Sequence, residues 1–159
     1  EIKMKRKYRI SIAVLLAIVL VLAAAGAWAA PEFQGTVPPI GTTQSGDKDH
    51  PINLGPLTVT TTGTCTMTAT IENPSFLAPA PTGKVIISAT FQLELSATCP
   101  VTISYAYPPA FADKNAKIYK LNTAVTPNVW VEVPSKVNPD GTISADVTEG
   151  GIYSLMGDL

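Results

Sequence analysis

The sequence predicts an all-β protein, a single antiparallel immunoglobulin-like β-sandwich that follows an N-terminal signal helix. Three observations predict this fold. Apolar and polar residues alternate in several short segments, turn-forming residues separate those segments, and no amphipathic helical pattern occurs after residue 30. We divide the 159 residues into a signal peptide (1–29), an extended arm (30–56) and the sandwich domain (57–159).

The first thirty residues have the order of a secretory signal peptide. A basic stretch ending at Arg9 precedes an apolar run from Ile10 to Ala25, and Ala27-Trp28-Ala29 places small residues at the −3 and −1 positions of a cleavage site. We expect cleavage after Ala29 and a secreted or cell-envelope location. The alternative is an uncleaved membrane anchor, because residues 10–30 would span roughly 31 Å as a helix.

Residues 30–56 are predicted to form a Pro/Gly-rich extended arm. They contain five prolines among glycine, threonine and serine, and they repeat at neither the strand period nor the helix period. One short edge strand is the most regular structure that we expect there. Because such an arm has no core of its own, it could complete the sheet of a second copy, so an oligomer is possible.

Residues 65–71 and 85–95 carry the strongest strand patterns. Every odd position from 85 to 95 is apolar, and Ile86 is the only large apolar residue at an even position. This alternation predicts a half-buried strand with Phe91 and Leu93 in the core. Residues 99–107 continue the same parity.

Further strands are predicted at residues 116–121, 129–133, 142–147 and 151–156. Asp140-Gly141 is a typical hairpin turn between two of them. Trp130 alternates out of phase with its valine neighbours. Either the valines are buried and the indole is an exposed stacking platform for a sugar or a partner surface, or Trp130 belongs to the core.

Cys65 and Cys99 are the only cysteines of the chain. An even number of cysteines in an exported protein predicts that the two form a disulfide. Two cysteines and one histidine do not supply a standard zinc site, so we expect no metal there.

The charge after the signal peptide argues against nucleic acid as a partner. From residue 30 onward the chain has six lysines, no arginine and eleven acidic residues, and therefore a net charge of −5. Phosphate binding needs clustered cations, which are missing here. Membrane contact is expected only through residues 10–30, if the signal is not cleaved.

The sequence contains no recognisable catalytic motif. The single histidine, His50, lies in the polar arm, and no nucleophile motif accompanies it. Glu94 and Glu132 fall on the predicted outer faces of their strands, which disfavours a pair of catalytic carboxylates. Asp47 and Asp49 lack the further acids and the glycine of a calcium loop. We therefore expect a non-enzyme without a cofactor.

The order of segments from Val101 to Leu155 resembles the C-terminal half of a β-sandwich module of bacterial surface proteins. That module is related to the domain shared by zona-occludens and netrin-receptor proteins. The resemblance rests on Val-Thr-Ile-Ser-Tyr (101–105), Ala-Lys-Ile-Tyr-Lys-Leu (116–121), Val-Trp-Val-Glu-Val (129–133), Gly-Thr-Ile-Ser-Ala-Asp-Val (141–147) and Gly-Ile-Tyr-Ser-Leu (151–155). It implies an assembly or interaction module.

Some relatives cleave their own backbone at a His-Phe-Ser-like site before the last strand. The matching residues here, Glu149-Gly150-Gly151, contain neither a histidine nor a hydroxyl nucleophile. The resemblance therefore does not imply self-cleavage.

These observations predict an exported, non-catalytic structural or adhesive module of the cell envelope or extracellular space. Its partner would be a protein or glycan surface. The alternative is a carbohydrate-binding module that uses Trp130 together with neighbouring tyrosines, and it requires an exposed indole.

Overall fold

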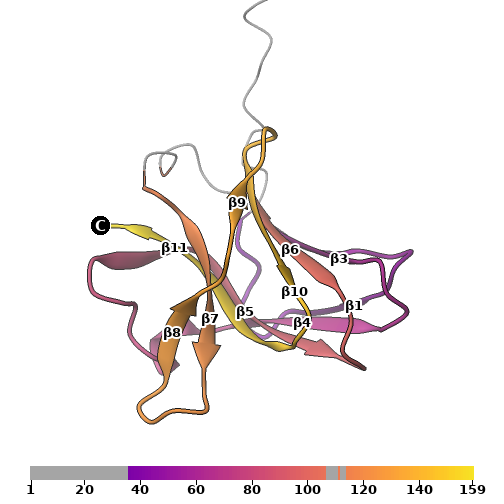
Figure 1. Ribbon diagram of the computed structural model, residues 1–159, viewed down its shortest axis with the longest axis horizontal. Helices are drawn as coiled ribbons and strands as arrows, with labels where there is room; N and C mark the ends of the chain where they lie inside the picture. Colours follow the sequence, from indigo (N-terminus) through magenta and orange to yellow (C-terminus); the bar gives the residue numbers. More distant parts are fainter. Residues whose placement is uncertain (1–35, 107–110, 112–113) are drawn as a thin grey trace, which may run out of the picture. The chain divides into compact units, whose positions relative to one another are not determined.

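A computed structural model of the chain describes residues 36–106, 111 and 114–159 (Figure 1). The predicted signal peptide, residues 1–29, lies outside the described residues. The all-β prediction is confirmed for the described residues, in which two antiparallel sheets form a β-sandwich and the only helical element is one 3₁₀ turn. No helix within the described ranges has the length and the apolar character needed to cross a membrane.

The larger sheet has six strands and the smaller sheet has five. In spatial order, the larger sheet comprises β1 (Thr43–Gly46), β4 (Met67–Glu72), β5 (Lys84–Leu95), β11 (Gly151–Asp158), β7 (Lys117–Asn122) and β8 (Val129–Glu132). The smaller sheet comprises β2 (Ile52–Leu54), β3 (Leu57–Thr61), β6 (Val101–Ala106), β10 (Thr142–Val147) and β9 (Lys136–Val137).

The core between the sheets confirms the predicted parity of β5. Phe91 and Leu93 are 0% and 1% exposed. The Phe91 ring stacks on Tyr153, with the ring centroids 5.9 Å apart, and meets Tyr105 edge-on. The Tyr105 hydroxyl donates a 3.0 Å hydrogen bond to the carbonyl oxygen of Ala89, so its polar atom has a partner inside the core.

The predicted disulfide between Cys65 and Cys99 is present, and both residues are buried. It joins the connection from β3 to β4 with the connection from β5 to β6, which are two places where the chain passes between the sheets. Beside it, the Thr61 hydroxyl donates a 2.6 Å hydrogen bond to the carbonyl oxygen of Pro100. A buried disulfide of this kind is typical of proteins in oxidising compartments.

The prediction of an extended arm over residues 30–56 is wrong for residues 43–54. This segment forms β1 and β2, which belong to different sheets, and Ile52 at 0% exposure is part of the core. Gln44 Oε1 accepts a 3.0 Å hydrogen bond from the backbone N–H of Asn53, which links the two edge strands. Strands of four and three residues are too short to show a period, and β1, with the sequence Thr-Gln-Ser-Gly, contains no apolar side chain.

A second apolar cluster lies on the outer face of the larger sheet. Adjacent residues of a strand point to opposite faces, so Tyr119 and Met156 point away from Ile118 and Leu155, which belong to the core between the sheets. The connection from β4 to β5, residues 73–83, covers this cluster; we call it the flap. The residues it covers or contributes are Tyr119, Leu121, Trp130, Met156, Leu77, Ala78, Ala80, Ile86 and Ile152.

The outer cluster explains the two sequence features that broke the alternation. Ile86 is apolar at an even position because it packs, partly buried, against the outer cluster. Trp130 is out of phase with its neighbours because it points to this cluster, whereas Val129 and Val131 are 43% and 49% exposed. Of the two registers considered for this strand, the one with exposed valines is the observed one.

Candidate functional site

The larger sheet splits where β7 and β11 diverge. The two strands pair over four residues, and their ladder ends at Lys120 and Tyr153. Beyond this point β7 still pairs with β8, and β11 still pairs with β5, but β7 and β11 no longer pair with each other. Figure 1 shows the β7–β8 hairpin projecting from the rest of the larger sheet. The divergence leaves a cleft between Leu121 and Ile152.

The cleft has a volume of about 630 Å³, which lies within the range of small-molecule and side-chain binding pockets. Its walls are mainly apolar, with polar groups at the rim. The apolar residues are Leu121, Ala124, Val131, Val133, Pro134 and Ile152, and the polar or charged ones are Gln92, Lys120, Asn122, Thr123 and Glu132. Val131 belongs to the edge strand of the sheet, so one wall of the cleft is open to solvent.

Gly150 and Gly151 form the β11 side of the cleft. A Cβ atom at Gly151 would lie 2.7 Å from Lys120 Cε, and one at Gly150 would lie 2.7 Å from the carbonyl oxygen of Leu93. Gly151 also has φ +149°, a conformation that residues with a side chain rarely adopt. The alternation of apolar and polar residues does not predict the cleft; the glycine pair at the start of the strand is the sequence signal for a special backbone position there.

Lys120 is the cation of the cleft, and its charge is already paired. Its Nζ donates a 2.9 Å hydrogen bond to Glu149 Oε2 and lies 5.8 Å from the centroid of the Tyr153 ring. Burial alone would lower the pKa of Lys120, but the hydrogen bond to Glu149, together with the charge interactions with Tyr153 and Glu149, outweighs burial and raises that pKa above its usual value. The same hydrogen bond lowers the pKa of Glu149. The Lys120 amine is therefore a charged group that is paired with Glu149.

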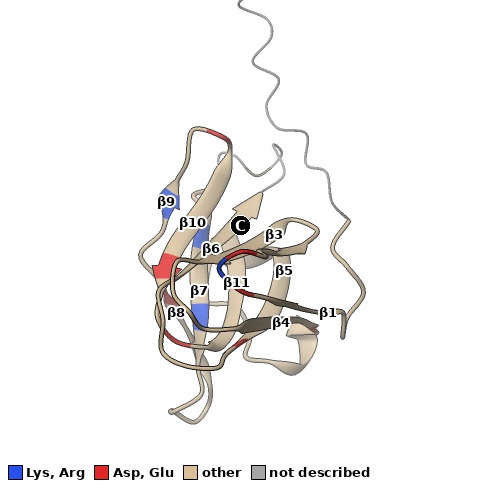
Figure 2. Ribbon diagram, turned by 90° about the vertical axis from the view of Figure 1, so that its right-hand side faces the viewer, with Lys and Arg blue, Asp and Glu red and all other residues tan. Residues whose placement is uncertain are grey.

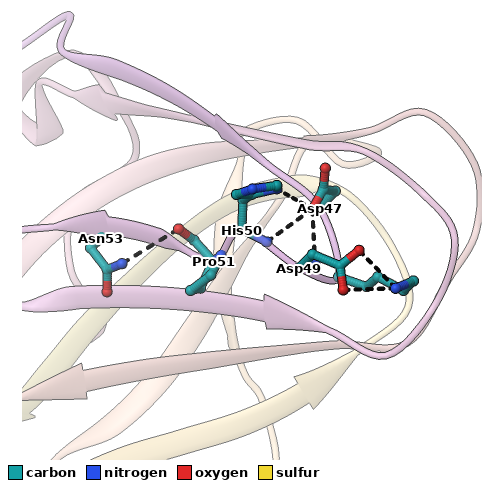
Figure 3. A network of polar contacts seen from close by, with 6 residues as sticks. Asp47, Asp49, His50, Pro51 and Asn53 are labelled. Atoms are coloured by element: carbon teal, nitrogen blue, oxygen red, sulfur yellow. Dashed lines mark hydrogen bonds and ion pairs between the residues drawn. The ribbon is translucent and has the colours of Figure 1, made fainter.

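The candidate catalytic base, His50, lies in a turn between β1 and β2 (Figure 3). The candidate calcium ligands, Asp47 and Asp49, belong to the same turn. Asp47 Oδ1 accepts hydrogen bonds of 2.9 Å from the backbone N–H groups of Asp49 and His50, and lies 3.0 Å from His50 Nδ1. The bond from Asp49 and then the His50 ring lower the pKa of Asp47. Lys48 pairs with Asp49 at 2.7 Å. These contacts close an exposed turn and leave the carboxylate of Asp47 occupied.

The two strand carboxylates do not form a pair. Glu94 is on β5 and Glu132 is on β8, with β11 and β7 between them, which is a separation of about 14 Å at the usual strand spacing. Across residues 36–106, 111 and 114–159, no group of three or more His, Cys, Asp or Glu side chains could hold a metal ion. Figure 2 shows acidic and basic residues scattered over the strands, with no basic stripe.

The prediction that Trp130 could serve as a stacking platform is wrong. The residue is 7% exposed, and its indole Nε1–H donates a 2.9 Å hydrogen bond to the carbonyl oxygen of Ala78 in the flap. Tyr105, Tyr119 and Tyr153 are also buried. Phe76, in the 3₁₀ turn η1 (Pro74–Phe76) of the flap, is in contrast 85% exposed.

The chain matches no protein-family model and no curated protein sequence. Its class is therefore described by its own structure, a disulfide-bonded β-sandwich whose larger sheet opens into an apolar cleft. The cleft is lined mainly by apolar side chains and by two charged ones, Lys120, which is paired with Glu149, and Glu132.

Proposed function

We propose that this chain is an exported, non-catalytic structural or adhesive module of the cell envelope or extracellular space. The apolar cleft beside the exposed edge strand β8 carries the proposal. An apolar hollow bordered by half-exposed valines is the kind of surface that contacts another macromolecule. The partner is a protein or glycan surface.

Three features support export. The basic, apolar and small-residue order of residues 1–29 is that of a cleaved signal peptide. The buried disulfide suits an oxidising compartment. The resemblance of residues 101–155 to a module of bacterial surface proteins favours the cell envelope and an immunoglobulin-like type of sandwich.

The first experiment tests export. The full chain, with a tag at its C-terminus, is expressed in a bacterium, and the cells are separated into cytoplasm, envelope and medium. We expect the protein in the envelope or medium, with an intact mass that lacks residues 1–29 and with no cysteine that reacts with a thiol reagent. Full-length, reduced protein confined to the cytoplasm would contradict the proposal.

The second experiment tests the contact surface. The exported protein is added to isolated envelopes of its own source cells, and the bound fraction is measured by sedimentation. We expect Val131→Glu, which places a charge in the cleft, to lower binding strongly. Val137→Glu is the matched control, because Val137 is 63% exposed on β9 and does not line the cleft. Equal binding by the two variants would show that the cleft is not the contact surface.

A further inference from the structure

Phe76 is a large aromatic side chain held out from the flap. It is 85% exposed, whereas the adjacent Leu77 and Ala78 pack against the outer cluster. Aromatic side chains, phenylalanine included, are enriched at protein interfaces relative to the rest of the surface.

The flap holds Phe76 in a defined position. Asn73 caps the 3₁₀ turn, since its side chain accepts a 3.0 Å hydrogen bond from the N–H of Ser75, and Pro74 occupies the first turn position. The Trp130 indole fixes the flap at Ala78. Because the turn is already ordered, little conformational entropy is lost when Phe76 binds a partner.

We propose that Phe76 of one copy of this chain inserts into the cleft between β7 and β11 of a second copy. This inference names the partner of the cleft and therefore rests on the proposed function. The cleft offers apolar walls and a volume of about 630 Å³, which is ample for one phenyl ring. The two parts of the contact, an exposed ring and an apolar hollow, are present on the same chain.

Charge favours this contact over other parts of the surface. The chain from residue 30 onward has a net charge of −5, so two copies repel each other overall. The flap, residues 73–83, contains no charged residue, and the cation of the cleft is compensated by Glu149. Glu132, the other charged residue that lines the cleft, is exposed and accepts a 3.4 Å hydrogen bond from the Tyr119 hydroxyl. A ring that enters the cleft while the Glu132 carboxylate stays in solvent buries no unpaired charge.

The contact joins unlike surfaces, so it is heterologous. Within one copy, the flap is fixed to Trp130 and Phe76 stays in solvent, which leaves the cleft free for another copy. Repetition of such a contact produces a chain of subunits, and a reciprocal exchange produces a closed pair. Either assembly fits a structural role at a cell surface.

The first test measures self-association of the exported protein by sedimentation velocity over a series of concentrations. We expect Phe76→Ser to weaken association by about 30-fold or more, the loss typical of removing an aromatic hot spot. Ile40→Ser and Val137→Ser are matched controls, because these side chains are 64% and 63% exposed and lie outside the flap and the cleft. Thermal unfolding confirms that all variants remain folded. A wild-type protein that stays monomeric at every concentration overturns the inference.

The second test mixes two variants that each fail to self-associate. Phe76→Ser keeps an intact cleft, and Val131→Glu keeps an intact ring. We expect the mixture to form a complex of the two variants, because one copy supplies the ring and the other supplies the cleft. A mixture that remains monomeric contradicts the inference even if each variant alone behaves as expected.

The third test locates the contact. A photo-reactive benzophenone amino acid replaces Phe76, and isotope-labelled and unlabelled copies are mixed before illumination. We expect cross-links between copies, to peptides that contain residues 120–124, 131–134 or 150–152. Cross-links within one copy, or to other segments, overturn the inference. If the wild type is monomeric while Val131→Glu still abolishes envelope binding, the inference fails and the proposed function stands.

Discussion

The indole N–H of Trp130 donates a 2.9 Å hydrogen bond to the carbonyl oxygen of Ala78, across 52 residues of sequence. This bond ties the edge strand β8 to the flap and closes the outer apolar cluster. It accounts for the burial of Trp130, and it holds the turn that displays Phe76. The stability of the flap and the exposure of Phe76 therefore depend on the same residue.

Trp130→Phe should destabilise the protein by about 1 to 2 kcal/mol. The substitution keeps an aromatic ring but leaves the Ala78 carbonyl without its donor. Urea denaturation measures the change, and hydrogen exchange of the flap amides should become faster. Val129→Ala, on the same strand but half-exposed, should change the stability by less than about 0.5 kcal/mol. Unchanged exchange in the flap of Trp130→Phe would contradict this role of the indole.

Replacing both Cys65 and Cys99 by serine should destabilise the fold by roughly 4 kcal/mol. The disulfide spans a sequence separation of 34, and closing a loop of that length restricts the unfolded chain. Guanidinium denaturation of the variant, compared with the oxidised and reduced wild type, gives the value. The reduced wild type should resemble the serine variant, and a variant as stable as the oxidised protein would refute the prediction.

Gly151→Ala should cost about 1 to 3 kcal/mol, because φ +149° strains any residue with a Cβ atom. Part of the cost comes from displacing the Lys120 side chain. The same substitution in a Lys120→Ala background should therefore cost about 0.5 kcal/mol less. Thermal or urea unfolding of the four proteins completes the double-mutant cycle. Equal costs in both backgrounds would mean that Lys120 does not restrict this position.

Acid should destabilise the junction of β5 and β11. Lys84 Nζ donates a hydrogen bond to Asp158 Oδ1, which lowers the pKa of Asp158 and raises that of Lys84. A lowered pKa in the folded state means that the carboxylate stabilises the fold above its ordinary pKa of 3.8, and that this contribution is lost as the pH falls through the lowered value. For Lys84 the loss occurs instead as the pH rises above 10.5 and through the raised pKa.

Melting temperatures recorded between about pH 2 and pH 7 test this expectation. Asp158→Asn should lower the melting temperature at neutral pH and should flatten its dependence on acid. Glu94→Gln is the control, because Glu94 is exposed on β5 away from Lys84. If Asp158→Asn and the wild type lose stability in parallel as the pH falls, the pair does not contribute to the acid response.

The sequence predicted the features that local chemistry controls. The alternation from 85 to 95 identified a strand and its buried face, because successive side chains of a strand point to opposite faces of the sheet and only one face lines the core between the sheets. The strand at 142–147 has the predicted bounds. The disulfide was predictable because Cys65 and Cys99 are the only two cysteines in the chain.

The predictions failed where a segment was too short to show a periodic pattern, or where the segment that packs on it in the folded protein could not be known from the sequence. For the residues of β1 and β2 the sequence predicts part of an arm, because four and three residues cannot establish a period. Trp130 could not be assigned to a face, since no rule of strand periodicity anticipates a second apolar layer.

By itself, the sequence determined the all-β class, the buried parity of the long strands and the disulfide, because each of these follows from residues that are close in sequence or few in number. Only the tertiary structure decided that Trp130 is covered, that Phe76 is not, and that a cleft opens after Lys120 and Tyr153. The reason is that pairing between strands and covering by the flap depend on contacts between segments far apart in the chain. A local pattern of apolar and polar residues does not specify where the pairing of two strands stops or which part of a sheet face another segment covers.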